Sequence, residues 1–243
     1  MQRETLFIAD LHLRATKPSI NRQFLNFLKI RARRASALYI LGDLFDTWVG
    51  DDDPSPPSKK VKQALRGLTS SGTAVYFQPG NRDFLIGTDF LAQTGARLIQ
   101  DYSVVDLYGV RTLLMHGDLL CTDDLPYLAF RKKSRSAEWQ REVLSKPLWL
   151  RLAYARWYRL RSFYHKLHKS EEIMDVNLKT VRSVMEQYRV LCLIHGHTHR
   201  PATHRLEING TPAQRIVLAQ WERGGSVLVL NQNGHRIESL GKG

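Results

Sequence analysis

Short apolar runs alternate with amphipathic stretches through the first third of the chain. Residues 5–8, 39–41 and 73–77 are apolar and have the length of buried strands. Between them, residues 18–34 and 59–70 place apolar side chains at helical spacing. This strand, helix, strand order predicts parallel strands that are covered by helices.

The later part of the chain predicts a mixture of parallel and antiparallel strands. Residues 103–107 and 110–115 flank Tyr108-Gly109, as in a hairpin. A helix near residues 181–188 should lead into a strand at 190–194. The sequence has no internal repeat and no low-complexity linker, so we expect one domain over residues 1–243. Four further strands, separated by the turn signals Asn209-Gly210 and Asn233-Gly234, are expected at 204–208, 215–218, 226–230 and 236–240.

Residues 131–169 differ in composition from the rest of the chain. Twelve Lys or Arg residues alternate there with Trp, Tyr and Phe, and Glu138 and Glu142 are the only acidic residues. We interpret this segment as a helical insertion that spans about residues 125–170. Such helices can lie on an anionic bilayer or hold acyl chains, bind nucleic acid, or cap the domain. The pattern alone leaves these three interpretations open.

The composition points to anionic partners and a reducing compartment. The 243 residues carry a formal charge of +13, and the pI is about 10.0, which favours phosphates, nucleic acid or an acidic membrane face. Two cysteines give no disulfide framework, so the cytoplasm is the expected location. No signal segment and no apolar run near the ~18 residues of a spanning helix is present. Any membrane contact should therefore be peripheral.

Five of the apolar runs end in a polar tip that is rich in Asp, His or Asn. Ligands of α/β proteins bind beyond the ends of strands, so we expect these tips to share one site. The candidate side chains are Asp10, His12, Asp43, Asn81, His116, His197 and His199.

Carboxylate and imidazole ligands together suit manganese, iron or zinc. Seven ligands are too many for one tetrahedral ion but fit two. Two ions about 3.5–4 Å apart can hold the attacking and leaving oxygens of an in-line displacement at phosphorus. We expect Asp43 to bridge the ions, because its strand is central. We interpret the acidic triplet at 51–53 as a loop that is solvated or supports the site from outside the ligand set, with direct ligation as the alternative.

Five motifs resemble those of the calcineurin-like metallophosphoesterases, in the same order along the chain. The resemblance implies a four-layer α-β-β-α sandwich of mixed sheets and a dinuclear metal centre that hydrolyses phosphate esters or anhydrides. The motifs are Asp10-Leu11-His12, Gly42-Asp43, Gly80-Asn81, His116-Gly117-Asp118 and Gly196-His197-Thr198-His199.

A closer resemblance, from about residue 5 to 226, is to the UDP-2,3-diacylglucosamine diphosphatases of lipid A synthesis. It implies two manganese ions, cleavage at the α-phosphorus to UMP and 2,3-diacylglucosamine 1-phosphate (lipid X), an insertion that forms a lid over the acyl chains, and peripheral attachment to the cytoplasmic face of the inner membrane. The motifs are Asp51-Asp52-Asp53, Gly80-Asn81-Arg82-Asp83, Leu120-Cys121-Thr122-Asp123-Asp124, Ile173-Met174-Asp175-Val176-Asn177 and His197-Thr198-His199-Arg200-Pro201.

The same resemblance implies roles for individual residues. Lys166 departs from the family pattern, because that position often carries an amide. The catalytic residues implied are Asp43, Asn81, Arg82 and His116. The substrate contacts implied are Asn81, Arg82, Asp124, Ser162, Lys166, Lys169 and His197.

Arg82 stands where many calcineurin-like enzymes carry a histidine that assists the leaving group. A guanidinium is a poor general acid but matches the geometry of phosphate oxygens. Arg82 should therefore stabilise charge in the transition state, which favours a leaving group that is already a weakly basic phosphate. Hydrolysis of nucleic acid or of another nucleotide pyrophosphate, and a scaffold without catalysis, are the competing interpretations.

Overall fold

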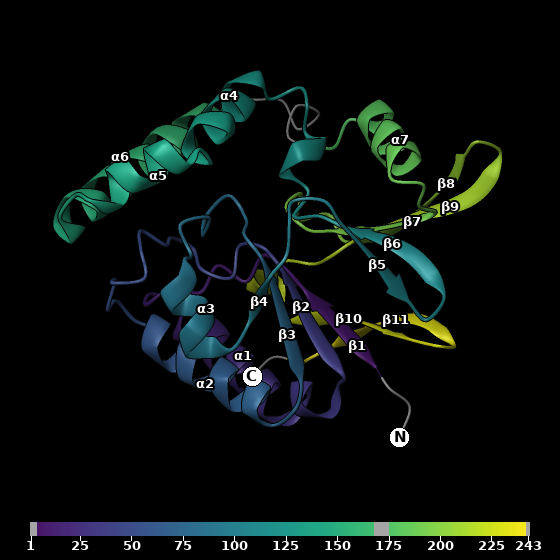
Figure 1. Ribbon diagram of the computed structural model, residues 1–243, viewed down its shortest axis with the longest axis horizontal. Helices are drawn as coiled ribbons and strands as arrows, with labels where there is room; N and C mark the ends of the chain where they lie inside the picture. Colours follow the sequence, from purple (N-terminus) through teal and green to yellow (C-terminus); the bar gives the residue numbers. More distant parts are fainter. Residues whose placement is uncertain (1–3, 168–174, 242–243) are drawn as a thin grey trace.

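The computed structural model describes residues 4–167 and 175–241. Two mixed sheets pack face to face in it, with helices on their outer faces (Figure 1). One buried cluster lies between the two sheets, and a further cluster lies between each sheet and the helices on its outer face. The order of layers is therefore helix, sheet, sheet, helix. The predicted α/β class with mixed sheets is confirmed.

The first sheet has six strands in the order β11-β10-β1-β2-β3-β4. Strands β1 to β4 run parallel, whereas β10 is antiparallel to β1 and to β11. The sheet is buried on both faces at β1 and β2, which explains why these strands are apolar without alternation. The bounds are β1 Thr5–Ile8, β2 Ala37–Leu41, β3 Ala74–Gln78, β4 Arg97–Leu98, β10 Ser226–Asn231 and β11 Gly234–Ser239.

The second sheet has five strands in the order β5-β6-β7-β9-β8. The central strands β6, β7 and β9 are parallel, and the outer strands β5 and β8 are antiparallel to their neighbours. The bounds are β5 Ser103–Leu107, β6 Val110–Leu114, β7 Cys192–His195, β8 Ala202–Ile208 and β9 Thr211–Val217.

Side-chain alternation along the strands fills the layers. Phe7 of β1 points between the sheets, where its ring stacks on Tyr39 at 5.0 Å between ring centroids, while Leu6 and Ile8 point to the helices. Helices α1 (Pro18–Ile30), α2 (Ser58–Ser70) and α3 (Thr88–Thr94) cover the first sheet, and α7 (Leu178–Gln187) covers the second. Short 3-10 helices are η1 (Ala32–Arg34), η2 (Asp118–Leu120) and η3 (Trp221–Arg223).

Three consecutive helices occupy the segment that we interpret as an insertion and call the insertion below: α4 (Leu125–Ser134), α5 (Ala137–Leu144) and α6 (Leu148–Leu167). They lie side by side on the part of the molecule far from the amino terminus (Figure 1). Side chains of Asp124 and Ser136 cap α4 and α5 by accepting from backbone N–H groups. None of the described helices is long and apolar enough to cross a membrane.

Some predicted elements differ from those observed. The helix expected over residues 18–34 ends at Ile30, and a 3-10 turn over Ala32–Arg34 follows. Between them, the side chain of Arg31 forms ion pairs with Glu4 and Glu238. Helix α3 and strand β4 were not predicted, since seven and two residues are too few to show a period.

Candidate metal centre

All seven candidate residues lie just beyond the carboxyl ends of parallel strands. Asp10 and His12 follow β1, Asp43 follows β2, and Asn81 follows β3. In the second sheet, His116 follows β6, and the loop after β7 carries the remaining two. Because the two sheets pack face to face, these loops meet at one end of the sandwich, and the side chains converge. The remaining two residues are His197 and His199.

The backbone of this site is held in an uncommon conformation. Five of the seven residues have positive φ, between 51° and 70°. Non-glycine residues rarely adopt this left-handed region, and such strain concentrates at functional sites. The five are Asp10, His12, Asp43, His197 and His199.

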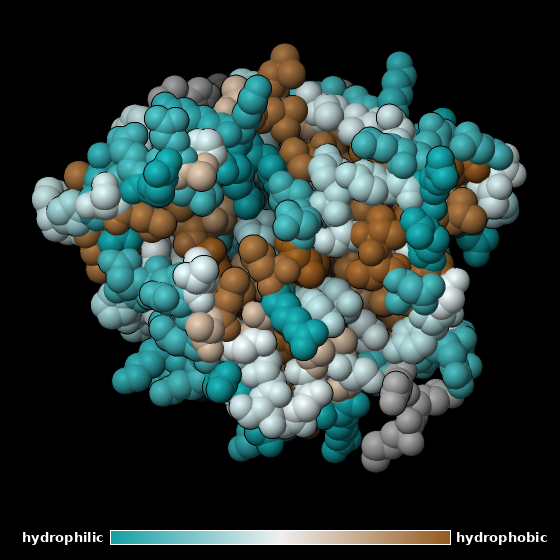
Figure 2. Space-filling model, in the orientation of Figure 1, coloured by the Kyte–Doolittle hydropathy of each residue, from teal (hydrophilic) through white to brown (hydrophobic). Residues whose placement is uncertain are grey.

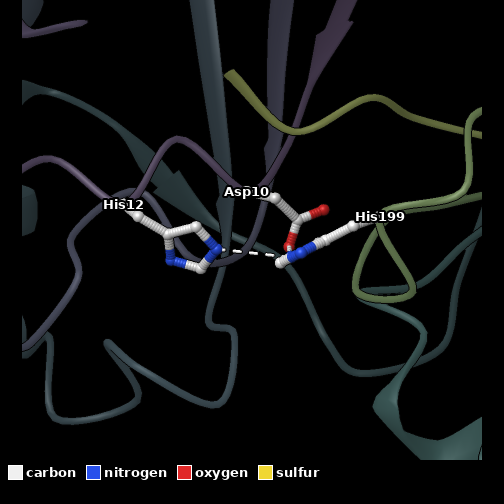
Figure 3. Close-up of side chains that lie close together, drawn as sticks. All are labelled: Asp10, His12 and His199. Carbon is white, nitrogen blue, oxygen red and sulfur yellow. Dashed lines mark hydrogen bonds and ion pairs between the residues drawn. The ribbon is translucent and has the colours of Figure 1, made fainter. Parts of the chain in front are cut away.

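The first group of side chains contains Asp10, His12 and His199, with ligand atoms within 4.8 Å of one another (Figure 3). The His12 and His199 Nε2 atoms are 3.3 Å apart, and His199 Nε2 is 3.5 Å from Asp10 Oδ1. Asp43 extends the group, since its Oδ2 lies 3.8 Å from His12 Nδ1.

The second group contains Asp43, Asn81, His116 and His197. Asn81 Oδ1 is 3.1 Å from His116 Nε2 and 3.0 Å from His197 Nδ1. Asp43 Oδ1 is 3.8 Å from His116 Nε2. The two oxygens of Asp43 thus face different groups, as a bridging carboxylate requires, although Asp10 also lies within reach of both.

These residues fit a pair of divalent ions. Asp10 Oδ1 and His12 Nδ1 are buried without any hydrogen-bond partner, which is costly unless a ligand satisfies them. The Nδ1 of His116 is 2.9 Å from the carbonyl oxygen of Leu41, so Nδ1–H donates there and Nε2 is left as the ligand atom. His116 Nε2 and the oxygen of Asn81 would therefore be two of the donors that hold a cation at the second group.

Two glycines let the ligand loops approach one another. A Cβ at Gly80 would lie 2.2 Å from Asp43 Oδ1, and one at Gly196 would lie 2.4 Å from Asp10 Oδ2. Both contacts are far inside van der Waals distance, so a larger residue would displace the carboxylates. Only glycine allows this spacing.

Burial and neighbouring charges set the protonation of the metal-free site. Burial raises the pKa of Asp43 to about 7, and the carboxylates of Asp83 and Asp10 add to this increase against the effect of His116. Burial also acts to raise the pKa of Asp10, but its contact with His199 and the charge of His116 lower it to about 2. Burial lowers the pKa of His12 to about 3. In the metal-free site, His12 is therefore a neutral imidazole, and Asp43 is a carboxyl group from which a bound metal must displace the proton.

We expect Asp43 to make the metal-free protein less stable as the pH rises. Its folded pKa of about 7 lies above the ordinary value of 3.8. Its contribution to stability is therefore fully present below about pH 4 and lost as the pH rises to about 7, at up to roughly 1.4 kcal/mol per pH unit. Urea unfolding of the wild type and Asp43→Asn, both with chelator, should show a difference in stability that declines over this range. Parallel pH curves would contradict it.

Only some of the other predicted site residues lie in the part of the chain that the structure describes. Arg82 is half-buried, and its side chain forms no hydrogen bond or ion pair within the described ranges. Asp124 caps α4 by accepting from Tyr127 N at 3.2 Å. Ser162 and Lys166 belong to α6, but their side chains lie outside the described part of the chain, as does all of Lys169.

The acidic triplet takes part in structural contacts. Asp51 accepts from the backbone N–H groups of Gly87 and Phe90 at the start of α3, at 3.0 and 2.8 Å. Asp52 pairs with Arg151 of α6, and Asp53 accepts from Ser55 N at 2.9 Å. These contacts favour a supporting role over direct ligation.

His195 is fully buried. Its Nδ1 is 2.8 Å from the carbonyl of Gly196, and Arg215 lies 3.2 Å from its Nε2. Burial and the charge of Arg215 lower its pKa to about 4. These contacts engage both ring nitrogens within the fold, so His195 supports the loop that carries His197.

Two buried carboxylates near the site had no role assigned from sequence. Asp83 accepts hydrogen bonds from four backbone N–H groups, including Leu44 at 2.7 Å and Gly80 at 2.8 Å. It thereby joins the loops after β2 and β3. Asp118 accepts from Tyr127 and Arg131 of α4. Asp83 and Asp118 each stand at the end of a motif that resembles the family, Gly80-Asn81-Arg82-Asp83 and His116-Gly117-Asp118, and these motifs were the sequence signal for both.

Comparisons with known proteins identify relatives of this chain. The model of the calcineurin-like phosphoesterase family matches residues 4–201. A UDP-2,3-diacylglucosamine hydrolase of Salmonella typhi is 51% identical over 92% of this chain and 93% of its own. One of Enterobacter sp. (strain 638) is 50% identical over 95% and 96%. A solved archaeal phosphodiesterase is 10% identical, with a TM-score of 0.48, over 97% of this chain and 99% of its own. The two sheets, the loops at their ends and the matching sequence place this chain in the calcineurin-like phosphoesterase family.

Proposed function

We propose that the protein hydrolyses UDP-2,3-diacylglucosamine at the α-phosphorus, giving UMP and 2,3-diacylglucosamine 1-phosphate. The observation that carries the proposal is the convergence of seven oxygen and nitrogen donors in two groups that share Asp43 and Asp10. Relatives with about half of their residues identical are named for hydrolysis of this compound. A pyrophosphate link suits a site of this kind, because both the entering and the leaving oxygens need charge stabilisation.

The residues of the chain would hold two divalent ions, with manganese the expected pair. Asp10, His12, Asp43 and His199 would hold one, and Asp43, Asn81, His116 and His197 the other. Bound ions would supply Lewis acidity at the phosphate oxygens and a nucleophile from water near neutral pH. Hydrogen bonds from Arg82 N and His197 N to the carboxylates of Asp43 and Asp10, at 2.9 and 2.8 Å, orient those ligands.

Arg82 is the group that would bind the phosphate oxygens. Arg82 directly follows the ligand candidate Asn81, and its positive charge acts to lower the pKa of both His12 and Asp43, which supports a position near the two ligand groups. A guanidinium with five N–H donors and no carboxylate partner in the described ranges can form a bidentate contact with a phosphate. Asn81 Oδ1 lies 3.0 Å from His197 Nδ1, and these two residues would complete the phosphate contacts.

The insertion would bind the acyl chains and the membrane surface. Several large apolar side chains on it are exposed, and Trp149 is 70% exposed. Figure 2 shows hydrophobic residues along the edge of the insertion that faces the rest of the molecule. Basic residues between them suit an anionic bilayer at the cytoplasmic face of the inner membrane. The exposed apolar residues are Leu125, Leu144, Trp149, Leu150, Leu152, Tyr154, Trp157 and Leu160.

Product analysis in ¹⁸O-labelled water tests the proposal. Purified protein with manganese should release UMP from UDP-2,3-diacylglucosamine, and the label should enter UMP, because attack at the α-phosphorus leaves the sugar phosphate unlabelled. Release of UDP, or label in the sugar phosphate, would contradict attack at that atom.

Two further substrates complete this experiment. A nucleotide sugar without acyl chains should be cleaved more slowly, and replacement of Trp149 and Trp157 by Ser should reduce turnover of the acylated substrate alone. Turnover of single-stranded nucleic acid, without turnover of the diacyl compound, would establish a nuclease in place of the proposed activity. The high positive charge makes that comparison necessary.

A further inference from the structure

One face of α4 carries three side chains that reach the loops of the metal centre. Tyr127, Arg131 and Arg135 are spaced four residues apart, which places them on the same side of the helix. Helix α4 belongs to the insertion, whereas the loops that these side chains contact belong to the two sheets. The helix therefore joins parts of the chain that the sheets leave separate.

Arg131 is tied to the loop that carries His116. Its Nε donates to Asp118 Oδ2 at 2.6 Å, and its Nη2 lies 2.9 Å from Asp101 Oδ1. Tyr127 donates its hydroxyl hydrogen to the same oxygen of Asp118, at 2.5 Å. Asp118 is 1% exposed and Arg131 is 8% exposed. This contact lies two residues from His116 and is closed to solvent.

Arg135 is tied to the loop that carries Asn81. Its Nη2 donates to the carbonyl oxygens of Gly80 at 2.8 Å and Pro79 at 3.3 Å. The guanidinium lies over the ring of Phe84, 5.1 Å from the ring centroid. Because the Gly80 carbonyl belongs to the peptide bond that leads into Asn81, this contact fixes the orientation of that peptide.

The two loops meet at the second ligand group, where His116 Nε2 and Asn81 Oδ1 are 3.1 Å apart. They come from different sheets, since His116 follows β6 and Asn81 follows β3. Helix α4 contacts both loops, because Arg131 and Arg135 lie on successive turns of the same helix. We infer that Arg131 and Arg135 are positioning residues, which set the distance between Asn81 and His116 and so build the second of the two proposed metal sites.

This role differs from simple attachment of the insertion. The insertion is also held by Arg151, whose Nη1 donates to the Val49 carbonyl at 2.6 Å, and by Arg159, which lies 2.5 Å from Asp46. Those contacts reach the segment after Asp43 and leave the pair of Asn81 and His116 untouched. Loss of the α4 contacts should therefore affect one ion more than the other, whereas loss of the Arg151 or Arg159 contact should not.

The test compares Arg135→Ala and Arg131→Ala with Lys132→Ala, an exposed cation on the same helix. Manganese is titrated into metal-free protein by equilibrium dialysis, and spin coupling between the ions is followed by electron paramagnetic resonance. Affinity for the second ion should fall about 10–100-fold, as for other residues that orient metal ligands. Binding of the first ion should be unchanged, and the signal of a coupled pair should give way to that of a single ion. Lys132→Ala should bind both ions as the wild type does.

Two further measurements separate positioning from folding. Arg135→Lys keeps a cationic donor for the Gly80 carbonyl and should restore part of the second affinity. Arg131→Lys cannot serve Asp118 and Asp101 together and should restore less. If the Ala variants bind both ions as tightly as Lys132→Ala does, the inference is overturned. This holds even if the metal-free Ala variants unfold at a lower temperature. The inference rests on the proposed two-ion function: a wild type that binds fewer than two ions overturns both, whereas a two-ion wild type with unaffected variants overturns the inference alone.

Discussion

Asp43→Ala should abolish turnover. Asp43 faces both ligand groups through separate oxygens, 3.8 Å from His12 and 3.8 Å from His116, and loss of even one group that serves to stabilise transition-state charge lowers the rate by about 10²–10³-fold. Removal of Asp43 should weaken both ions and lower kcat by at least about 10³-fold. Metal analysis after manganese loading should find fewer than two ions per chain, measured together with UMP release.

Two variants make this result specific. Asp43→Asn keeps the shape and the hydrogen bond from Arg82 N but loses the charge, so it should lose nearly as much activity as Asp43→Ala. Asp89→Ala removes an exposed carboxylate in the first turn of α3 and should leave both metal content and turnover unchanged. An Asp43→Ala protein that retained two ions and normal turnover would remove Asp43 from the centre of the mechanism.

The layered arrangement could be predicted from sequence because each strand and helix shows its own burial pattern in the local sequence. Strands such as β1 and β2 are apolar throughout, and the amphipathic helices between them show which face is buried. The sheet that each tail strand joins could not be predicted in this way. Four tail strands are predicted from the turns Asn209-Gly210 and Asn233-Gly234, but β9 joins the second sheet beside β7, and β10 joins the first beside β1. Turn signals define a hairpin but not the sheet to which it belongs.

The ligand set could be predicted because each member follows an apolar run. Rules that relate strand ends to sites then bring residues as distant as Asp10 and His199 together. The supporting contacts follow no such rule. Arg135 meets the Gly80 carbonyl across 55 positions of sequence, and a basic residue on a helix suggests solvent as readily as a backbone acceptor. Asp118 was visible only as the end of a motif, and its burial against Arg131 depends on where the insertion packs.

Arg82→Ala should slow the chemical step while leaving metal binding intact. The side chain of Arg82 forms no ion pair or hydrogen bond in the ranges that the structure describes, although its backbone N–H holds Asp43 Oδ1 at 2.9 Å. The substitution keeps that backbone contact and removes only the guanidinium. Loss of one group that stabilises transition-state charge should lower kcat about 10²–10³-fold. Steady-state kinetics with the diacyl substrate, together with metal analysis of the same samples, measures both quantities.

The division between kcat and KM shows where the guanidinium acts. A contact made equally in the bound substrate and in the transition state would raise KM and leave kcat unchanged, whereas one that strengthens as charge develops lowers kcat. Arg82→Lys keeps the charge but loses the bidentate geometry, so its kcat should lie between those of the wild type and Arg82→Ala. If Arg82→Ala lost metal as well as turnover, the guanidinium would be supporting the ligands. Its position beside Asp43 and His12 would then explain that loss, and the leaving phosphate would have to be stabilised by another cation of the site.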